Sequence, residues 1–298
     1  MVAVSLIWGA NFSANKYALG SIPPVAFAAS RFAIASILLF ALVRYLEPGQ
    51  PVPARRAWAI AGLGVIGNTC YQALFMIGLT TTTAINSSLI LAGVPTVVAV
   101  LGTVLGVERA SAGLWLGIVV ATAGVILVIA ARGVSFDAAT LRGDLLILLA
   151  GFCWAAFTVG IRHAGRGLDP LRVTALATYG GMPGLVLASW PRLIRTDWLH
   201  LTSGTWIALA FSSVFSIVVA YTIWSYAVQG IGGSRTALYN CVIPVFAALV
   251  AWFVLGERPV VAQGFGAALV FVGVYLSQRA PTTRFSAQGS RIPGVPES

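Results

Sequence analysis

The chain has 298 residues, of which 58% are hydrophobic and 9% charged, and its 18 Lys and Arg against 8 Asp and Glu give a net charge of +10. A water-soluble protein of this length cannot bury so much apolar surface, because much of any globule faces water. The composition excludes a soluble enzyme, and it indicates a membrane protein whose basic residues flank its spans rather than a nucleic-acid-binding protein.

Ten apolar runs follow one another along the chain, each near the ~20 residues that a helix needs to cross a hydrocarbon core about 30 Å thick. The first run carries no basic n-region, so it is predicted to be a retained span rather than a cleaved signal peptide. The predicted spans cover residues 1–19, 24–46, 57–79, 82–105 and 112–131, then 143–161, 170–190, 204–228, 233–255 and 260–278. Residues 281–298, rich in Ser, Pro and Arg, are expected to form a disordered cytoplasmic tail.

The two sets of five spans share a pattern at a fixed separation. The fourth span reads PTVVAVLGTVLGVER from Pro95, and the ninth reads PVFAALVAWFVLGER from Pro244, each with a Glu-Arg pair near its end. These prolines lie 149 residues apart, and two glycines of the following span repeat at the same separation: Gly117 and Gly124 recur as Gly266 and Gly273. The sequence therefore predicts two homologous halves, residues 1–131 and 143–280.

A repeat of five spans has odd parity, so the second half must enter the membrane in the opposite orientation. The predicted fold class is an all-α membrane protein of ten transmembrane helices, built as two inverted five-helix repeats, an architecture in which secondary transporters bind substrate near the midplane. With the amino end inside, ten Lys and Arg lie in the inner loops and tail against six in the outer loops. This bias predicts a bacterial-type inner (plasma) membrane protein with both termini in the cytoplasm.

Short motifs link the chain to a known family. The stretch WGANF from Trp8, and the LGVER and LGER endings of the fourth and ninth spans, resemble the EamA-type transporters of the drug/metabolite transporter superfamily. Within that superfamily the chain is most similar to YddG-type amino-acid exporters, including exporters of aromatic amino acids. The resemblance covers residues 1–280 and implies export of small metabolites. The second half has CWAAF from Cys153 in place of WGANF, so the two halves need not contribute equally to a site.

Polar and aromatic side chains recur at helical spacing inside the predicted spans, where polar groups are costly unless they are paired or face an aqueous cavity. Amides can bind ammonium and carboxylate groups, and aromatic faces can hold a side chain or a cation, so a small zwitterion suits such a cavity. The alternative is that these side chains only bond neighbouring helices together. The predicted substrate-binding residues are Trp8, Asn11, Asn15, Asn68, Tyr71, Gln72, Asn86, Trp154, Thr158, Tyr221, Trp224, Tyr239 and Asn240.

Two prolines and three cations complete the candidates. Pro95 and Pro244 remove backbone hydrogen bonds in mid-span, so they are predicted to be hinges for alternating access, with a static kink as the alternative. Lys16, Arg31 and Arg235 are expected to snorkel to an interface, with a role in binding a substrate carboxylate or in gating as the alternative.

The acidic residues all fall in loops or at span edges, whereas proton pumps usually use acidic groups inside the membrane. This distribution favours gradient-driven export over proton antiport. The pairs Glu108-Arg109 and Glu257-Arg258 are expected to be ion pairs at helix ends.

The resulting prediction is a secondary transporter that exports amino acids and related small metabolites by alternating access. Its expected partners are zwitterionic substrates and membrane lipid, without nucleic acid, cofactor or metal, and GxxxG pairs are expected to pack within a monomer. An exporter of drugs or other metabolites with the same fold is the main alternative. A membrane sensor or an intramembrane enzyme has less support, because the spans contain no GxSxG, HExxH or buried carboxylate pair.

Overall fold

The computed structural model describes residues 1–46, 52–82, 87, 90–108, 111–130, 140–255 and 261–279, and within these ranges it contains helices and no strand. The first half has α1 (Val2–Ala18), α2 (Pro24–Leu46), α3 (Ala54–Gly64), α4 (Tyr71–Leu79), α6 (Val94–Val104) and α7 (Ala112–Ala130). The second half has α8 (Leu141–Ala164), α9 (Pro170–Leu193), α10 (Ser203–Phe211), α11 (Ala220–Ile231), α12 (Gly233–Ala237), α13 (Ile243–Leu255) and α14 (Val261–Arg279). Predicted residues 83–86, 109, 257–258 and 281–298 lie outside the described parts.

Three irregular helical segments join pairs of these α-helices into longer continuous helices. A π-helix, η1 (Val65–Cys70), connects α3 to α4, and a second π-helix, η2 (Ser212–Val219), connects α10 to α11. A 3₁₀ segment, η3 (Leu238–Val242), joins α12 to α13. π-Helical turns are rare and frequently mark functional sites, because they widen the helix and re-aim its side chains.

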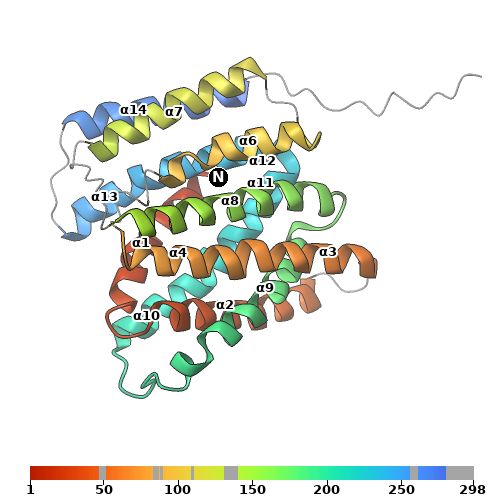
Figure 1. Cartoon of the computed structure of the whole chain (residues 1–298), viewed down its shortest axis with the longest axis vertical. Helices are drawn as coiled ribbons and strands as arrows, with labels where there is room; N and C mark the ends of the chain where they lie inside the picture. The colour runs from red at the N-terminus through yellow and green to blue at the C-terminus, as the bar shows by residue number, and fades with distance from the viewer. Residues whose placement is uncertain are drawn as a thin grey trace, which may run out of the picture.

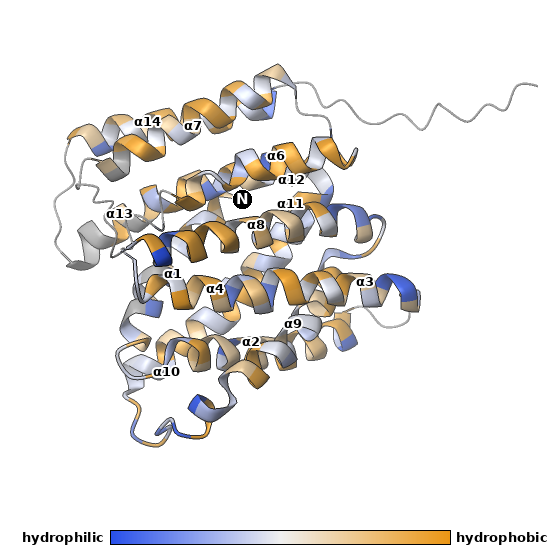
Figure 2. Cartoon of the chain, viewed as in Figure 1, coloured by the Kyte–Doolittle hydropathy of each residue, from blue (hydrophilic) through white to orange (hydrophobic). Residues whose placement is uncertain are grey.

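The helices form a bundle that is apolar along its length and polar at its two ends (Figures 1 and 2). Large hydrophobic side chains lie exposed on the helix flanks, such as Ile37, Leu187 and Ile207, which are 70%, 75% and 69% exposed. Apolar flanks of this kind are what lipid-facing helices require.

Six helical stretches within the described residues are long and apolar enough to cross a membrane. They are Pro24–Leu46, Ala54–Leu79, Leu141–Ala164, Ser203–Ile231, Gly233–Val250 and Val261–Arg279. Two shorter apolar helices, Ile90–Val104 and Ala112–Leu127, accompany them. The predicted multi-span helical architecture is therefore confirmed, while the count of ten spans goes beyond these six.

Four pairs of helices, one member from each half of the chain, begin at nearly constant separation. The starts of α3 and α10, of α6 and α13, and of α7 and α14 are each separated by 149 residues, and those of α2 and α9 by 146. The π-helices η1 and η2 interrupt α3–α4 and α10–α11 at corresponding places. These four helix starts and the π-helical interruption thus recur along the chain.

α7 and α14 pack closely through their recurring glycines and lie together at the top of the bundle in Figure 1. A Cβ atom on Gly117 would lie 2.6 Å from the carbonyl oxygen of Gly273, and one on Gly124 would lie 2.6 Å from that of Gly266. Such backbone contact requires residues without a Cβ atom. The sequence predicted this glycine repeat, and the structure uses it as one helix–helix interface.

Candidate functional site

Five aromatic side chains from four helices meet inside the bundle. The ring centroids of Trp8 on α1 and Trp154 on α8 lie 5.9 Å apart, edge to face. Tyr71 on α4 and Tyr221 and Trp224 on α11 have centroids between 5.2 and 5.5 Å from that of Trp154. Aromatic rings attract one another at these distances and tilts. We call these five residues the central aromatic cluster.

Two indole N–H groups in the cluster differ in their partners. Nε1 of Trp8 donates a hydrogen bond of 3.1 Å to the carbonyl oxygen of Ser216, which lies on η2. Nε1 of Trp224 is buried and has no acceptor among the described residues, and the Trp224 side chain is 1% exposed. A buried donor without an acceptor is uncommon, and it marks a place where a bound molecule could supply one.

Arg31 of α2 is buried beside the cluster. Its side chain is only 3% exposed, and its terminal nitrogens donate 2.9 Å and 2.6 Å bonds to Ser212 Oγ and Gln72 Oε1. The guanidinium also lies 5.6 and 5.9 Å from the ring centroids of Phe27 and Phe32. The expectation that Arg31 snorkels to an interface is wrong, because neighbouring helices enclose its charged group.

The partners of Arg31 connect it to the aromatic cluster. Gln72 Nε2 donates to the hydroxyl of Tyr221 over 3.5 Å, a pair separated by 149 residues. Ser212 Oγ donates to Asn15 Oδ1 over 3.3 Å. Asn15, Arg31, Gln72, Ser212 and Tyr221 therefore form one hydrogen-bonded chain, which we call the Arg31 network. It shares Tyr221 with the aromatic cluster.

Seven of the thirteen predicted site residues belong to the cluster or the network: Trp8, Asn15, Tyr71, Gln72, Trp154, Tyr221 and Trp224. They come from α1, α4, α8 and α11, which lie side by side in the bundle. The tertiary structure thus brings together positions as far apart in the chain as Trp8 and Trp224, which are separated by 216 residues.

The other predicted residues have different surroundings. Asn68 is fully buried on η1, where its Nδ2 donates 3.0 Å to the carbonyl oxygen of Ala177 on α9. Thr158 lies beside Gly233 of α12, and the carbonyl of Tyr239 accepts from Ser5 Oγ at 2.9 Å. Asn11 is buried on α1, with its Oδ1 lacking a partner among the described residues, and Asn240 is half-buried in η3. Asn86 lies outside the described residues.

Substrate binding is predicted for Arg31 only as the alternative to snorkelling, and Ser212 is not among the predicted site residues. Arg31 lies about a third of the way along an otherwise apolar helix, which was a signal of burial. The three serines of η2, Ser212, Ser213 and Ser216, are all buried, and their spacing in SSVFS was a signal of a polar helix face.

Both predicted hinge prolines follow a break in a helix. Pro95 is the second residue of α6, directly after a turn at Gly93, where the amide of Thr96 donates 3.1 Å to the Gly93 carbonyl. Pro244 is the second residue of α13, directly after the 3₁₀ segment η3. A proline in the first helical turn loses no intrahelical bond, so each break is compatible with its proline.

Glu108 closes one end of the bundle. Its carboxylate accepts hydrogen bonds from Ser234 N at 3.0 Å, from Ser234 Oγ at 2.7 Å and from the amide of Gly233, and it lies 3.7 Å from Arg162 Nε. Gly232, with φ of +97°, makes the turn that presents these amides. The sequence predicts that Glu108 pairs with Arg109, but Arg109 lies outside the described residues. The ion pair that the structure describes for Glu108 is with Arg162 of α8.

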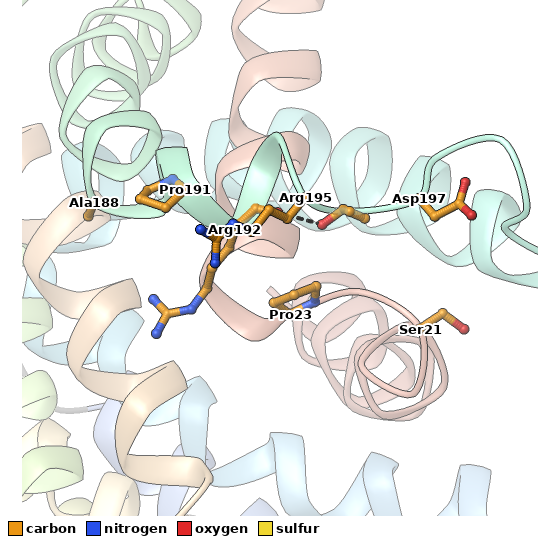
Figure 3. A pocket seen from close by; sticks show the side chains of 8 residues that line it. Ser21, Pro23, Ala188, Pro191, Arg192, Arg195 and Asp197 are labelled. Atoms are coloured by element: carbon orange, nitrogen blue, oxygen red, sulfur yellow. Dashed lines mark hydrogen bonds between the residues drawn. The ribbon is translucent and has the colours of Figure 1, made fainter.

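The opposite end of the bundle holds an open hollow of about 610 Å³ between the α1–α2 connection and the end of α9 (Figure 3). Arg192 and Arg195 line it together with Pro23, and Thr196 donates 2.7 Å to the carbonyl of Arg192. None of the predicted site residues lines this hollow. No group of three potential metal ligands occurs among the described residues.

The chain is similar to transporters over nearly its whole length. A model of the EamA-like transporter family matches residues 1–130 and 141–278. The uncharacterized transporter YyaM of Bacillus subtilis is 31% identical over 92% of this chain and 90% of its own length. An uncharacterized transporter of Archaeoglobus fulgidus is 30% identical over 91% of this chain and 93% of its own length.

More distant similarity extends to a plant protein and a solved structure. A WAT1-related, chloroplastic protein of Arabidopsis thaliana is 29% identical over 93% of this chain and 68% of its own length. One crystal structure superposes with a TM-score of 0.75 at 17% identity, covering 92% of this chain and 93% of that chain. At that identity the superposition establishes a shared fold alone.

Proposed function

Since the chain belongs to the EamA-like transporter family, we propose that it is a secondary transporter that exports amino acids and related small metabolites. The observation that carries the proposal is the contact between the central aromatic cluster and the Arg31 network inside the bundle. Aromatic faces would hold an apolar side chain, and amide, hydroxyl and guanidinium groups would hold the charged end of the same molecule.

We further propose that the ten helices form two inverted repeats, residues 1–131 and 143–280. Helix starts separated by 149 residues support this arrangement. Equivalent positions of the two halves also meet: Gln72 contacts Tyr221, and Cys241 Sγ lies 4.0 Å from the carbonyl oxygen of Ala92, each pair being 149 residues apart. Only positions near a two-fold axis contact their own equivalents, so these contacts favour a pseudo-two-fold axis through the site.

Alternating access is the proposed mechanism. Glu108 ties α6, α8 and α12 together at one end, while the hollow beside Arg192 lies open at the other. The paired breaks before Pro95 and Pro244 would let the ends of α6 and α13 tilt as one half rocks against the other. The binding site would then open to each side of the membrane in turn.

The chain is a multi-pass membrane protein, and we propose that it lies in the inner membrane with both termini in the cytoplasm. The end of the bundle closed by Glu108 also carries Arg56, whose guanidinium donates 3.0 Å to the carbonyl of Ala164. Arg162 and Arg166 lie at the same end. Such clustering of arginine favours the cytoplasmic side for this end.

An exporter of drugs or other metabolites is the alternative. The charge of Arg31 discriminates between this alternative and an amino-acid exporter. Lipophilic cations would also suit an aromatic cluster, but a buried guanidinium repels them. An amino acid has a carboxylate that the same group attracts. This charge favours the amino-acid proposal, including the YddG-like substrates that the sequence motifs imply.

The direct test is counterflow uptake of a panel of labelled amino acids into proteoliposomes. We expect saturable uptake by the wild type and at least a tenfold loss in Trp154→Ala, because Trp154 contacts the other four rings of the cluster. Trp58→Ala is the matched control, since Trp58 is 78% exposed on α3. The absence of uptake of every amino acid by folded wild-type protein would overturn the proposed substrate class.

A further inference from the structure

We infer that Arg31 is the carboxylate anchor of the transport site, so that the carrier selects substrates with a free carboxylate and rejects their uncharged amides. The inference rests on the proposed function for its setting and adds the group that determines specificity. It assigns to Arg31 a counterion that the described parts of the chain do not provide.

Arg31 carries a positive charge that is buried without a carboxylate beside it in the described structure. Its guanidinium is buried among α2, α4 and η2, and the structure pairs it with no carboxylate in the described parts of the chain. The described acidic groups are engaged elsewhere: Glu108 caps α12, Asp144 contacts Thr82, Asp169 caps α9 and Asp197 contacts His200. A buried cation without a counterion is expensive to maintain, and in a membrane protein it is a functional candidate by default.

The hydrogen bonds of the Arg31 guanidinium leave part of its donor capacity unused among the described residues. Its two terminal nitrogens are held by neutral oxygens, Ser212 Oγ and Gln72 Oε1. Its Nε–H is buried without an acceptor. Guanidinium groups match carboxylates with two parallel hydrogen bonds, and neutral acceptors stabilise the charge less than a carboxylate does. The group is thus oriented by its neighbours while its charge stays unpaired.

Aromatic side chains lie next to the Arg31 network. Gln72 connects Arg31 to Tyr221, and Tyr221 lies 5.5 Å, between ring centroids, from Trp154. A molecule whose carboxylate meets Arg31 would therefore have its remainder near aromatic faces. One isolated guanidinium carries a single positive charge, which matches a monocarboxylate better than a doubly charged phosphate. The geometry points to an organic monocarboxylate with an apolar or aromatic remainder.

The transport test compares L-phenylalanine with L-phenylalaninamide, whose carboxylate is replaced by an uncharged amide. Wild-type proteoliposomes are expected to prefer the acid. Arg31→Gln should reduce this preference by about 30-fold or more, as expected when one partner of a buried charge pair is removed. Arg56→Gln is the matched control and should leave the preference unchanged, because the hydrogen bonds described for Arg56 go to the backbone carbonyls of Ala164 and Arg166, at the end of the bundle away from Arg31.

A second variant guards against misfolding of Arg31→Gln. Gln72→Glu places an internal carboxylate where an oxygen already accepts from Arg31 at 2.6 Å. This change should preserve thermal stability and yet abolish the preference for the acid, because Arg31 is then neutralised from within. A Gln72→Glu protein that still prefers the acid as strongly as the wild type would overturn the inference.

Binding provides a readout that does not depend on amino-acid transport. The thermal midpoint of the purified wild type should rise with 3-phenylpropionate and not with 3-phenylpropanamide, and neither Arg31→Gln nor Gln72→Glu should respond. If no amino acid is carried but this pattern holds, the proposed function fails and the carboxylate anchor stands. If amino acids are carried while acid and amide behave alike, or if only inorganic phosphate stabilises the wild type, the anchor is refuted and the proposed function stands.

Discussion

Trp224 is a buried residue of the central aromatic cluster whose indole N–H has no acceptor among the described residues. Its ring packs 5.2 Å, between centroids, from that of Trp8, and its Nε1–H is buried with no acceptor in the described structure. By contrast, Trp8 donates to the Ser216 carbonyl. Two tryptophans in contact therefore differ in one respect: one N–H is bonded to the protein, and the other has no acceptor among the described residues.

We predict that Trp224→Phe weakens substrate binding without destabilising the protein. The change removes an unpaired buried donor and keeps most of the ring packing, so the free energy of unfolding should stay equal or rise. The loss of one hydrogen bond of about 0.5–1.5 kcal/mol should raise the KM of counterflow by about 3–10-fold. A parallel measurement of thermal midpoints checks stability, and an unchanged KM would show that the indole N–H takes no part in binding.

At the scale of elements, α7 and α14 illustrate how small residues position whole helices. Their glycines meet crosswise: Gly117 faces Gly273, and Gly124 faces Gly266. Van der Waals packing is a main force between helices in lipid, because hydrocarbon tails are as apolar as the side chains. A contact through bare backbone brings the two helices to the shortest separation.

We predict that Gly273→Ala destabilises the protein and that Gly264→Ala, on the same helix, does not. A Cβ atom at Gly273 would lie 2.4 Å from the Ala121 amide nitrogen, whereas one at Gly264 has open space around it. Overpacking of this kind lowers the free energy of unfolding by about 1–3 kcal/mol, while glycine to alanine in an open helix position is neutral or stabilising by up to about 1 kcal/mol. Thermal unfolding of both variants in one detergent measures the difference; equal midpoints would contradict the close packing of α7 on α14.

At the scale of the whole molecule, charge is distributed in two distinct ways. The described acidic residues Glu108, Asp144, Asp169 and Asp197 lie at helix ends or in connections, where they cap helices or pair with polar neighbours. Arg31 is buried within α2 instead. The described interior thus offers a fixed positive charge for an anion and no carboxylate that could shuttle protons.

This distribution predicts that export does not depend on a proton gradient. With the substrate gradient held constant, a protonophore should leave the initial rate of net substrate efflux from proteoliposomes unchanged. A valinomycin-treated sample controls for the membrane potential. If the protonophore abolishes transport while valinomycin does not, the carrier is coupled to protons, and the gradient-driven proposal is wrong.

Much of this protein follows from its sequence alone. Apolar runs of span length determine that the chain is a helical membrane protein, because backbone polar groups in lipid must be satisfied within each helix. The separation of 149 residues between matched prolines and glycines also appears in the helix boundaries. These properties depend on local composition and spacing, which are visible without any tertiary contact.

The tertiary structure alone decided which polar side chains share a site. Helical periodicity assigns a residue to a face of its own helix, but it does not say which faces of different helices meet. Asn68 and Gln72 come from adjacent turns, yet Asn68 bonds α9 while Gln72 holds Arg31. The burial of Arg31 likewise depends on Ser212, which lies 181 residues away in the chain. In the sequence, Arg31 lies within reach of a membrane interface. Its enclosure by neighbouring helices therefore depends on how the helices pack.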